Sequence, residues 1–133
     1  RLFFTSHESG GAGCSECHSG PHFSDFTLRN NGLRPAPDLN DLGRYRVTGK
    51  EKDKFLFSTP SLRNIAITSP YMHDGRFKNL TEVIEHYNTA LQQTPTLDPA
   101  LKKQGLKLKA AEKKALLAFL QTLTDPQFIE AAK

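Results

Sequence analysis

Five consecutive residues near the amino end constrain this chain more than any other feature. Cys14 and Cys17 are separated by two residues, and His18 follows the second cysteine directly. The two intervening residues put both sulfurs on one side of a helical turn, and the next residue then points at a metal. A C-x-x-C-H segment of this kind is typical of c-type haem attachment, in which the thiols form thioethers with the haem vinyl groups and the imidazole binds the iron.

Other interpretations of this segment have less support. A four-ligand zinc site would need a second pair of soft ligands, and the chain has no cysteine besides Cys14 and Cys17. A thioredoxin-type redox pair would require a strand-rich βαβ context, which the sequence lacks. A chance structural pair of cysteines stays open as an alternative. We therefore predict one covalently bound haem c per chain.

Length and composition fit a single compact domain over residues 1–133. Hydrophobic residues make up 37% of the chain, so a buried porphyrin would supply apolar area that a modest core lacks. The 18 basic and 14 acidic residues give a net charge of +4, and no basic stripe interleaved with aromatics indicates nucleic acid. No apolar run is long enough to predict a membrane span.

Regular hydrophobic periods are weak in several parts of the chain. Residues 1–9 are expected to form a short helix before the glycine-rich turn at 10–13. Residues 21–60 follow neither a helical nor a strand period, and we expect an irregular segment with a turn or short hairpin. A loop of this length usually covers a site in a compact domain. Another short helix is expected at 98–105, between an Asp-Pro pair and a glycine.

Two longer helices are predicted near the carboxy end. The first begins at Leu80, with Asn79 or Thr81 as its cap, and its apolar stripe contains Leu80, Val83, Ile84, Tyr87 and Leu91. The second is expected to stop at Asp125 and Pro126, and its stripe contains Leu108, Ala111, Ala115, Leu116, Phe119, Leu120 and Leu123. Together with the haem motif, these elements predict an all-α, cytochrome c-like fold with a long irregular segment before the later helices.

Several segments resemble the carboxy-terminal haem domain of the bacterial di-haem cytochrome c peroxidases and the related MauG proteins. The longest resemblance lies in residues 59–77, which include Tyr-Met-His-Asp-Gly at 71–75, and continues in residues 80–88. Shorter segments at 41–49 and 118–124 resemble the family in the same order. This pattern is far more specific than the C-x-x-C-H signature, which any c-type cytochrome shares.

The resemblance implies a periplasmic enzyme of which this chain is one domain. Such an enzyme takes electrons from a small cytochrome c or copper protein and reduces hydrogen peroxide. The amino-terminal haem domain, with its own C-x-x-C-H, is not in these residues. Because haem is attached outside the cytoplasm, a targeting segment is also expected, so we interpret the chain as a piece of a longer precursor.

The second axial ligand of the iron has several candidates, namely Met72, His22, His73, His86 and Tyr87. His22 lies only four residues after His18, which makes the opposite haem face hard to reach. His86 lies about 100° around the helix from the apolar stripe, whereas Tyr87 lies on it. In the family that this chain resembles, the ligand follows the histidine of the His-Asp-Gly motif by fourteen residues. The same count from His73 reaches Tyr87, so we predict Tyr87 as the ligand, with Met72 as the alternative.

Three further residues are weaker candidates. Arg63 could pair with a haem propionate through its planar guanidinium, or it could anchor a loop. The resemblance also implies a calcium site at the boundary between the two domains, held in part by backbone carbonyls. Thr68 and Pro70 match those positions, and the remaining ligands would come from the absent domain.

Three functions fit these observations. The first is the electron-accepting haem domain of a di-haem cytochrome c peroxidase. The second is a free-standing monohaem electron carrier that uses the same fold without catalysis. The third is a MauG-like oxidase that acts on protein side chains. We favour the first, since the long motif serves a two-domain partnership that a carrier does not need. A second C-x-x-C-H upstream would support the peroxidase.

Overall fold

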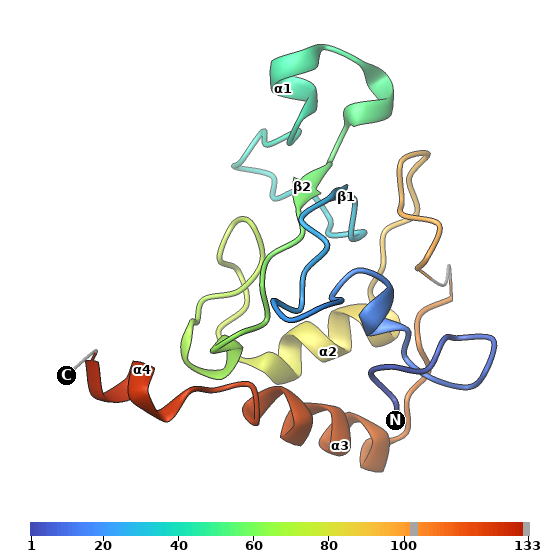
Figure 1. The fold of residues 1–133 in the computed structure, drawn as a ribbon. Coiled ribbons are helices and arrows are strands. Elements are labelled where there is room, and N and C mark those ends of the chain that lie inside the picture. The colour runs from blue at the N-terminus through green and yellow to red at the C-terminus, as the bar shows by residue number, and fades with distance from the viewer. Residues whose placement is uncertain (102–103, 132–133) are drawn as a thin grey trace.

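The computed structural model describes residues 1–101 and 104–131 and is mostly helical with few strands. Helices α2 and α3 pack together at the base of the molecule, and α1 lies at the far end of the long middle segment (Figure 1). The elements in chain order are η1 (Cys14–Glu16), β1 (Leu28–Arg29), α1 (Tyr45–Thr48), η2 (Glu51–Asp53), β2 (Phe57–Ser58), η3 (Ile65–Ile67), α2 (Leu80–Thr89), α3 (Ala110–Gln121) and α4 (Pro126–Ala131).

Helix α2 begins where the sequence predicts it. The extended Asn79 is its cap, because the side-chain Oδ1 accepts a hydrogen bond from the backbone N–H of Glu82 at 3.0 Å. Leu80 and Ile84 are buried on its inner face. The helix ends at Thr89, so the last residue of the predicted stripe lies beyond it.

Helix α3 also lies within its predicted range. The backbone N–H of Lys109 donates to the Glu112 carboxylate at 2.8 Å, which fixes the first turn. Leu116 and Leu120 are buried, whereas the alanines of the predicted stripe are exposed. We expected Pro126 only to stop this helix, but it is also the first residue of α4. Proline is well tolerated at the first position of a helix, because its missing N–H would have no partner there.

The two short helices expected outside this pair are not formed in the described residues. Residues 1–9 make turns, because Phe3 packs into the core with its ring 4.9 Å from that of Phe119. Residues 98–101 also form a turn, in which the Asp98 carboxylate accepts from the N–H of Ala100, and 102–103 lie outside the described residues. Gly105 packs against α2. A Cβ at this position would lie 2.0 Å from the carbonyl oxygen of Asn88, so only glycine fits.

The middle of the chain is irregular, as expected, but it is tied together by one long-range pairing. Leu28 faces Ser58 and Arg29 faces Phe57 in an antiparallel ladder. These strands lie about thirty residues apart, so the pairing is not a local hairpin. It brings the segment after the haem motif beside the segment that leads into residues 59–77.

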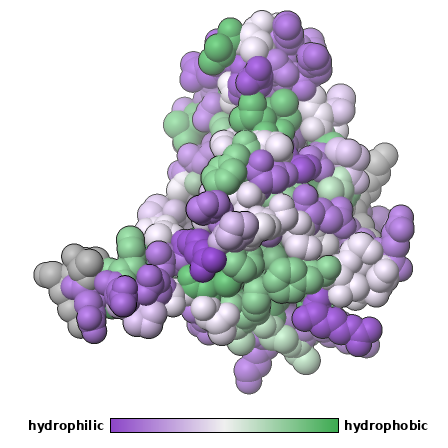
Figure 2. All heavy atoms as spheres, viewed as in Figure 1, coloured by the Kyte–Doolittle hydropathy of each residue, from purple (hydrophilic) through white to green (hydrophobic). Residues whose placement is uncertain are grey.

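The core is small and joins the amino end to α2 and α3. Its buried cluster consists of Phe3, Tyr71, Leu80, Ile84, Leu116, Leu120 and Leu123. Apolar residues gather on the lower half of the face in Figure 2, over the region of α2 and α3. Within residues 1–101 and 104–131, no helix combines the length and apolar character of a membrane span.

Candidate functional site

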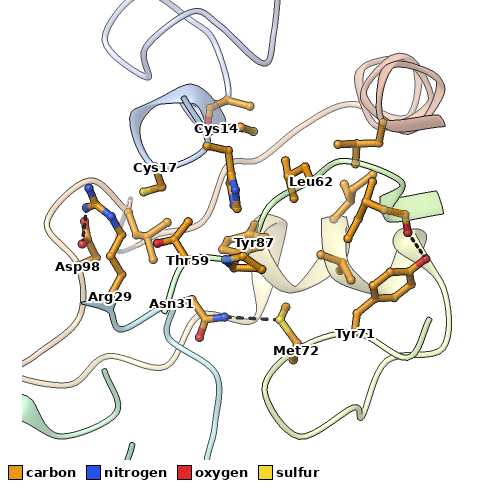
Figure 3. Close-up of a pocket in the computed structure, with 18 of the residues that line it drawn as sticks. Cys14, Cys17, Arg29, Asn31, Thr59, Leu62, Tyr71, Met72, Tyr87 and Asp98 are labelled. Carbon is orange, nitrogen blue, oxygen red and sulfur yellow. Dashed lines mark hydrogen bonds and ion pairs between the residues drawn. The ribbon is translucent and has the colours of Figure 1, made fainter. Parts of the chain in front are cut away.

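A cavity of about 440 Å³ lies between η1, the segment after β2, and helices α2 and α3. Its walls are largely apolar, with a few polar groups among them, as in sites for small molecules and cofactors. In Figure 3, Cys14 and Cys17 lie on one side of Tyr87, and Asn31 and Met72 lie on the other. The cavity therefore brings the C-x-x-C-H segment and the two favoured distal ligands to one place.

The two cysteines occupy the wall formed by η1. Gly13 starts this turn with a φ of +63°, and the N–H of His18 donates to the carbonyl of Cys14 at 2.9 Å. Both cysteines are free and partly buried. Burial raises the pKa of Cys14 to about 12 and that of Cys17 to about 11. Without a bound group, both are therefore neutral thiols at neutral pH.

The His18 imidazole is oriented by the loop that follows it. Its Nδ1 lies 3.0 Å from the carbonyl oxygen of Phe23, and because a carbonyl only accepts, Nδ1 carries the proton. The Nε2 lone pair is then available to a ligand in the cavity. Burial lowers the pKa of His18, so the neutral, metal-binding form predominates at neutral pH.

Tyr87 lines the cavity from α2, together with Val83 and Ile84, as the helical stripe predicts. Burial raises the pKa of Tyr87 to about 12, although a hydrogen bond with the Asn31 side chain acts in the opposite direction. The phenol is therefore neutral by itself. A cation at the centre of the cavity would be needed to stabilise the phenolate.

Met72 and His73 line the cavity as well. Met72 has a positive φ of 71°, and its sulfur accepts a hydrogen bond from the Asn31 side chain at 3.5 Å. The His73 ring stacks on Phe57 with 3.7 Å between ring centroids, and its Nδ1 lies 3.5 Å from an Asp41 carboxylate oxygen. His73 is thus held at the edge of the cavity by two neighbours.

Two histidines weighed as ligands lie outside the cavity wall. His86 is buried, with 4% of its surface exposed, and its Nε2 lies 2.9 Å from the carbonyl oxygen of Asn31. His22 is exposed and lies against the ring of Phe26. Neither is among the described residues that line the cavity.

The remaining predicted residues divide between the cavity and the surface. Thr68 and Pro70 lie on the cavity wall, before the turn that carries Met72. Arg63 is exposed and is not among the described residues of the wall; its Nε donates to the carbonyl of Pro21 at 2.8 Å. Among the described residues, no three or more His, Cys, Asp and Glu side chains form a metal cluster.

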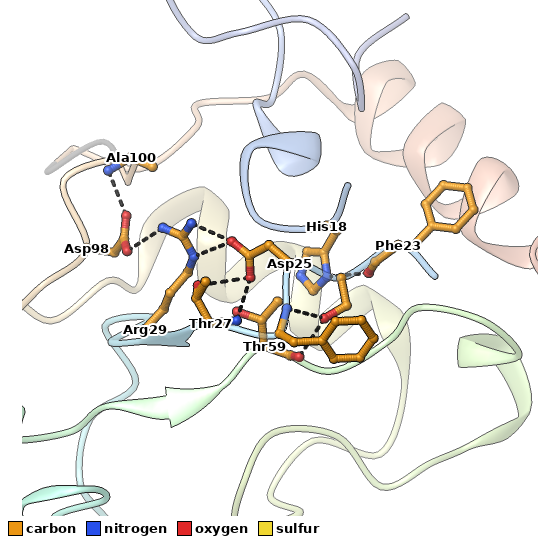
Figure 4. A network of polar contacts seen from close by, with 10 residues as sticks. His18, Phe23, Asp25, Thr27, Arg29, Thr59, Asp98 and Ala100 are labelled. Carbon is orange, nitrogen blue, oxygen red and sulfur yellow. Dashed lines mark hydrogen bonds and ion pairs between the residues drawn. The ribbon is translucent and has the colours of Figure 1, made fainter. Parts of the chain in front are cut away.

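Sequence reasoning missed an ion-pair network beside the cysteines. Arg29 lines the cavity and binds two carboxylates, with its Nη1 2.7 Å from Asp98 and its Nε 3.1 Å from Asp25 (Figure 4). The N–H of Asp25 in turn donates to the carbonyl of Cys17 at 2.9 Å. The network therefore ties the loop after the haem motif to the loop at 98–101. The contact between Arg29 and Asp98 spans 69 residues, and no local pattern could have indicated it.

Acid should weaken this network through Asp25. Burial opposes ionisation of Asp25, but hydrogen bonds from Arg29 and Thr27 outweigh it and lower the pKa from 3.8 to about 2. A lowered folded-state pKa gives stability that is present above about pH 4 and lost as the pH falls towards 2. The free energy of unfolding of the haem-loaded chain, measured by urea titration, should fall across this range, and less so in Asp25→Asn.

The exposed carboxylate of Asp38 offers a matched control for this experiment. Asp38→Asn should leave the acid dependence as it is in the wild type. An equal acid dependence in wild type and Asp25→Asn would contradict the assignment of this stability to Asp25.

The residues at the cavity fit a covalently bound haem. Two thiols lie at C-x-x-C spacing on one wall, a neutral imidazole is held there through Nδ1, and a phenol and a thioether lie on other parts of the same wall. The thiols are the attachment groups of a c-type haem. The imidazole, the phenol and the thioether are groups that bind haem iron.

Comparison with proteins of known sequence finds relatives over most of the chain, although no family model matches. A protein named cytochrome-c peroxidase IdrP2 from Pseudomonas sp. (strain SCT) is 34% identical over 91% of this chain and 39% of its own length. The methylamine utilization protein MauG from Methylorubrum extorquens is 35% identical over 86% of this chain and 32% of its own. The chain thus spans about a third to two-fifths of these relatives.

Solved structures give the same result at the level of the fold. A MauG-like protein associated with microbial copper homeostasis matches with a TM-score of 0.76 and 34% identity, over 96% of this chain and 46% of that one. The di-haem peroxidase BthA from Burkholderia thailandensis matches with a TM-score of 0.70 and 20% identity, over 96% and 42% of the two chains. The second match supports the fold alone.

Proposed function

Because this chain is homologous over most of its length to the di-haem cytochrome c peroxidase and MauG family, we propose that it is a haem-c domain of a periplasmic di-haem cytochrome c peroxidase. The observation that carries this proposal is the placement of Cys14, Cys17, His18 and Tyr87 around one cavity. The haem, when bound, supplies one-electron redox chemistry. The whole enzyme would accept electrons from a small cytochrome c or copper protein and pass them on to hydrogen peroxide.

In this proposal the chain attaches and orients the group. Cys14 and Cys17 would hold it through thioethers, and the His18 imidazole would bind the iron. Tyr87 would supply the second ligand, with Met72 as the alternative. A phenolate stabilises ferric and higher-valent iron, because a hard anionic donor offsets the metal charge.

Two weaker assignments belong to the same proposal. Arg63 is proposed to reach a haem propionate, although in the structure its guanidinium holds the loop at Pro21. Backbone carbonyls of Thr68 and Pro70 are proposed to contribute to a calcium site at the boundary with the amino-terminal haem domain. Both residues lie on the wall of the cavity in which the haem would bind.

A MauG-like oxidase of protein side chains is a second candidate. The placement of a tyrosine on the cavity wall favours it, because phenolate ligation suits oxidised iron better than simple electron storage does. Both candidates share the haem attachment and differ in the substrate of the whole protein. A monohaem carrier remains a third candidate.

Covalent attachment is the first test. The chain, produced with the haem-attachment machinery, should keep one haem through acid-acetone extraction. Cys14→Ala and Cys17→Ala should each leave a single thioether or a labile haem, whereas Ser15→Ala, within the same motif, should behave as the wild type. Extraction of the haem from the unaltered chain would contradict the assignment.

The coding sequence upstream of Arg1 then distinguishes the whole-protein functions. A second C-x-x-C-H upstream supports the two-haem enzyme. A signal peptide alone in that position supports the monohaem carrier. In the two-haem protein, peroxide reduction with a reduced donor and oxidation of a protein side chain are the activities to compare.

A further inference from the structure

Asn31 lies directly below Tyr87 in the view of Figure 3, beside Met72. It lines the cavity two residues after β1, and its side-chain Nδ2 donates to the Met72 sulfur at 3.5 Å. No motif points to this residue, and the proposed haem function assigns it no role. Its amide is nevertheless the polar group that lies between both favoured distal ligands.

The orientation of the Asn31 amide is set by its neighbours. Its Oδ1 accepts a hydrogen bond from the N–H of Leu33 at 3.2 Å, so the oxygen is held towards the backbone and the NH₂ group faces the cavity. Its carbonyl oxygen accepts from Nε2 of the buried His86 at 2.9 Å. His86 immediately precedes Tyr87 on α2, and this contact therefore fixes the position of Asn31 relative to Tyr87.

The Asn31 side chain has two neighbours in the cavity, the Met72 sulfur and the Tyr87 phenol, with which it makes the hydrogen bond that acts against the raised pKa of Tyr87. A thioether sulfur is a poor acceptor, and an amide has two N–H groups to donate. A phenolate oxygen is a much stronger acceptor, because hydrogen bonds to charged groups are shorter and stronger than neutral ones. The amide is thus placed as a donor for an anionic oxygen at Tyr87.

We propose that Asn31 is a positioning residue that donates a hydrogen bond to the Tyr87 phenolate when this oxygen is the distal ligand. This inference rests on the proposed haem function. The hydrogen bond draws electron density from the oxygen and makes it a weaker donor to the ferric iron. Asn31 thereby raises the reduction potential above the value that an unassisted phenolate would give.

The test compares reduction potentials and visible spectra of the haem-loaded chain. Asn31→Leu removes the donor with little change in size and no change in charge. It should shift the ferric-to-ferrous equilibrium about tenfold towards ferric, which lowers the one-electron reduction potential by about 59 mV. The phenolate-to-iron charge-transfer band should move to longer wavelength. Asn31→Gln, which keeps an amide donor, should recover part of both changes.

A double-mutant cycle identifies the partner. If Asn31 acts through the phenolate, Asn31→Leu should have no further effect on the potential in a Tyr87→Phe background. The same shift in that background would overturn the inference, because it would show a general effect of polarity. The inference would also be overturned if Asn31→Leu lost its effect on the potential only in a Met72→Leu background. That result would identify Met72 as the partner of Asn31.

Haem content separates this inference from the proposed function. An unchanged potential in an Asn31→Leu chain that retains its acid-acetone-resistant haem overturns the inference alone. Extraction of the haem from the unaltered chain overturns both.

Discussion

Without covalently attached haem, the chain is expected to be largely unfolded or molten. The buried core cluster contains seven residues, and six of them also line the cavity, namely Phe3, Tyr71, Leu80, Ile84, Leu116 and Leu120. Without haem, these side chains would line a cavity of about 440 Å³ that is partly open to water, and they would lose the apolar contacts that a porphyrin makes. The stability of a typical domain is only about 5–15 kcal/mol. Because this margin is small, the loss of the contacts with the porphyrin is expected to disrupt the fold.

Far-ultraviolet circular dichroism on two preparations of the chain checks this expectation. The haem-loaded chain should melt cooperatively. The same chain produced without the attachment machinery, or with both Cys14 and Cys17 replaced by alanine, should show reduced helical signal and a broad transition. A cooperative melt of the haem-free chain at a similar temperature would contradict the argument and would mean that the cavity closes by repacking.

How much of the structure the sequence could predict depends on the range of the interactions. Helix α2 follows from local signals, since Asn79 caps it and its apolar residues recur at helical spacing. The placement of Tyr87 on the cavity wall follows from the same spacing. The C-x-x-C-H segment forms a tight turn on the same wall, and its three functional residues lie within five positions of the sequence.

The features that sequence reasoning missed depend on contacts between distant residues. Arg29 meets Asp98 across 69 residues, and Asn31 meets Met72 across 41 residues. A short helix was predicted for residues 1–9, before the glycine-rich turn, but Phe3 is buried against Phe119 of α3 and the backbone makes turns instead. Tertiary packing overrides local preference where a segment is short.

Tyr87→Phe is expected to change the ferric spectrum and raise the reduction potential of the haem-loaded chain strongly. In the proposed site, the phenolate would be an anionic ligand that favours ferric iron, and its loss would remove this preference. The shift should be on the order of 100 mV or more, within the roughly 0.8 V range over which axial ligands tune haem. Met72→Leu should leave both properties close to those of the wild type, because its sulfur is not expected to bind the iron.

The cavity itself makes this comparison informative. Tyr87 and Met72 both lie on the wall and both contact Asn31, so either could reach the iron from the side that His18 leaves free. A thioether ligand gives ferric haem a weak near-infrared charge-transfer band, and a phenolate does not. This band in the wild type, abolished by Met72→Leu alone, would reject the tyrosine. Insensitivity to both substitutions would point to a histidine on the wall, His73 or His7, or to an open iron site.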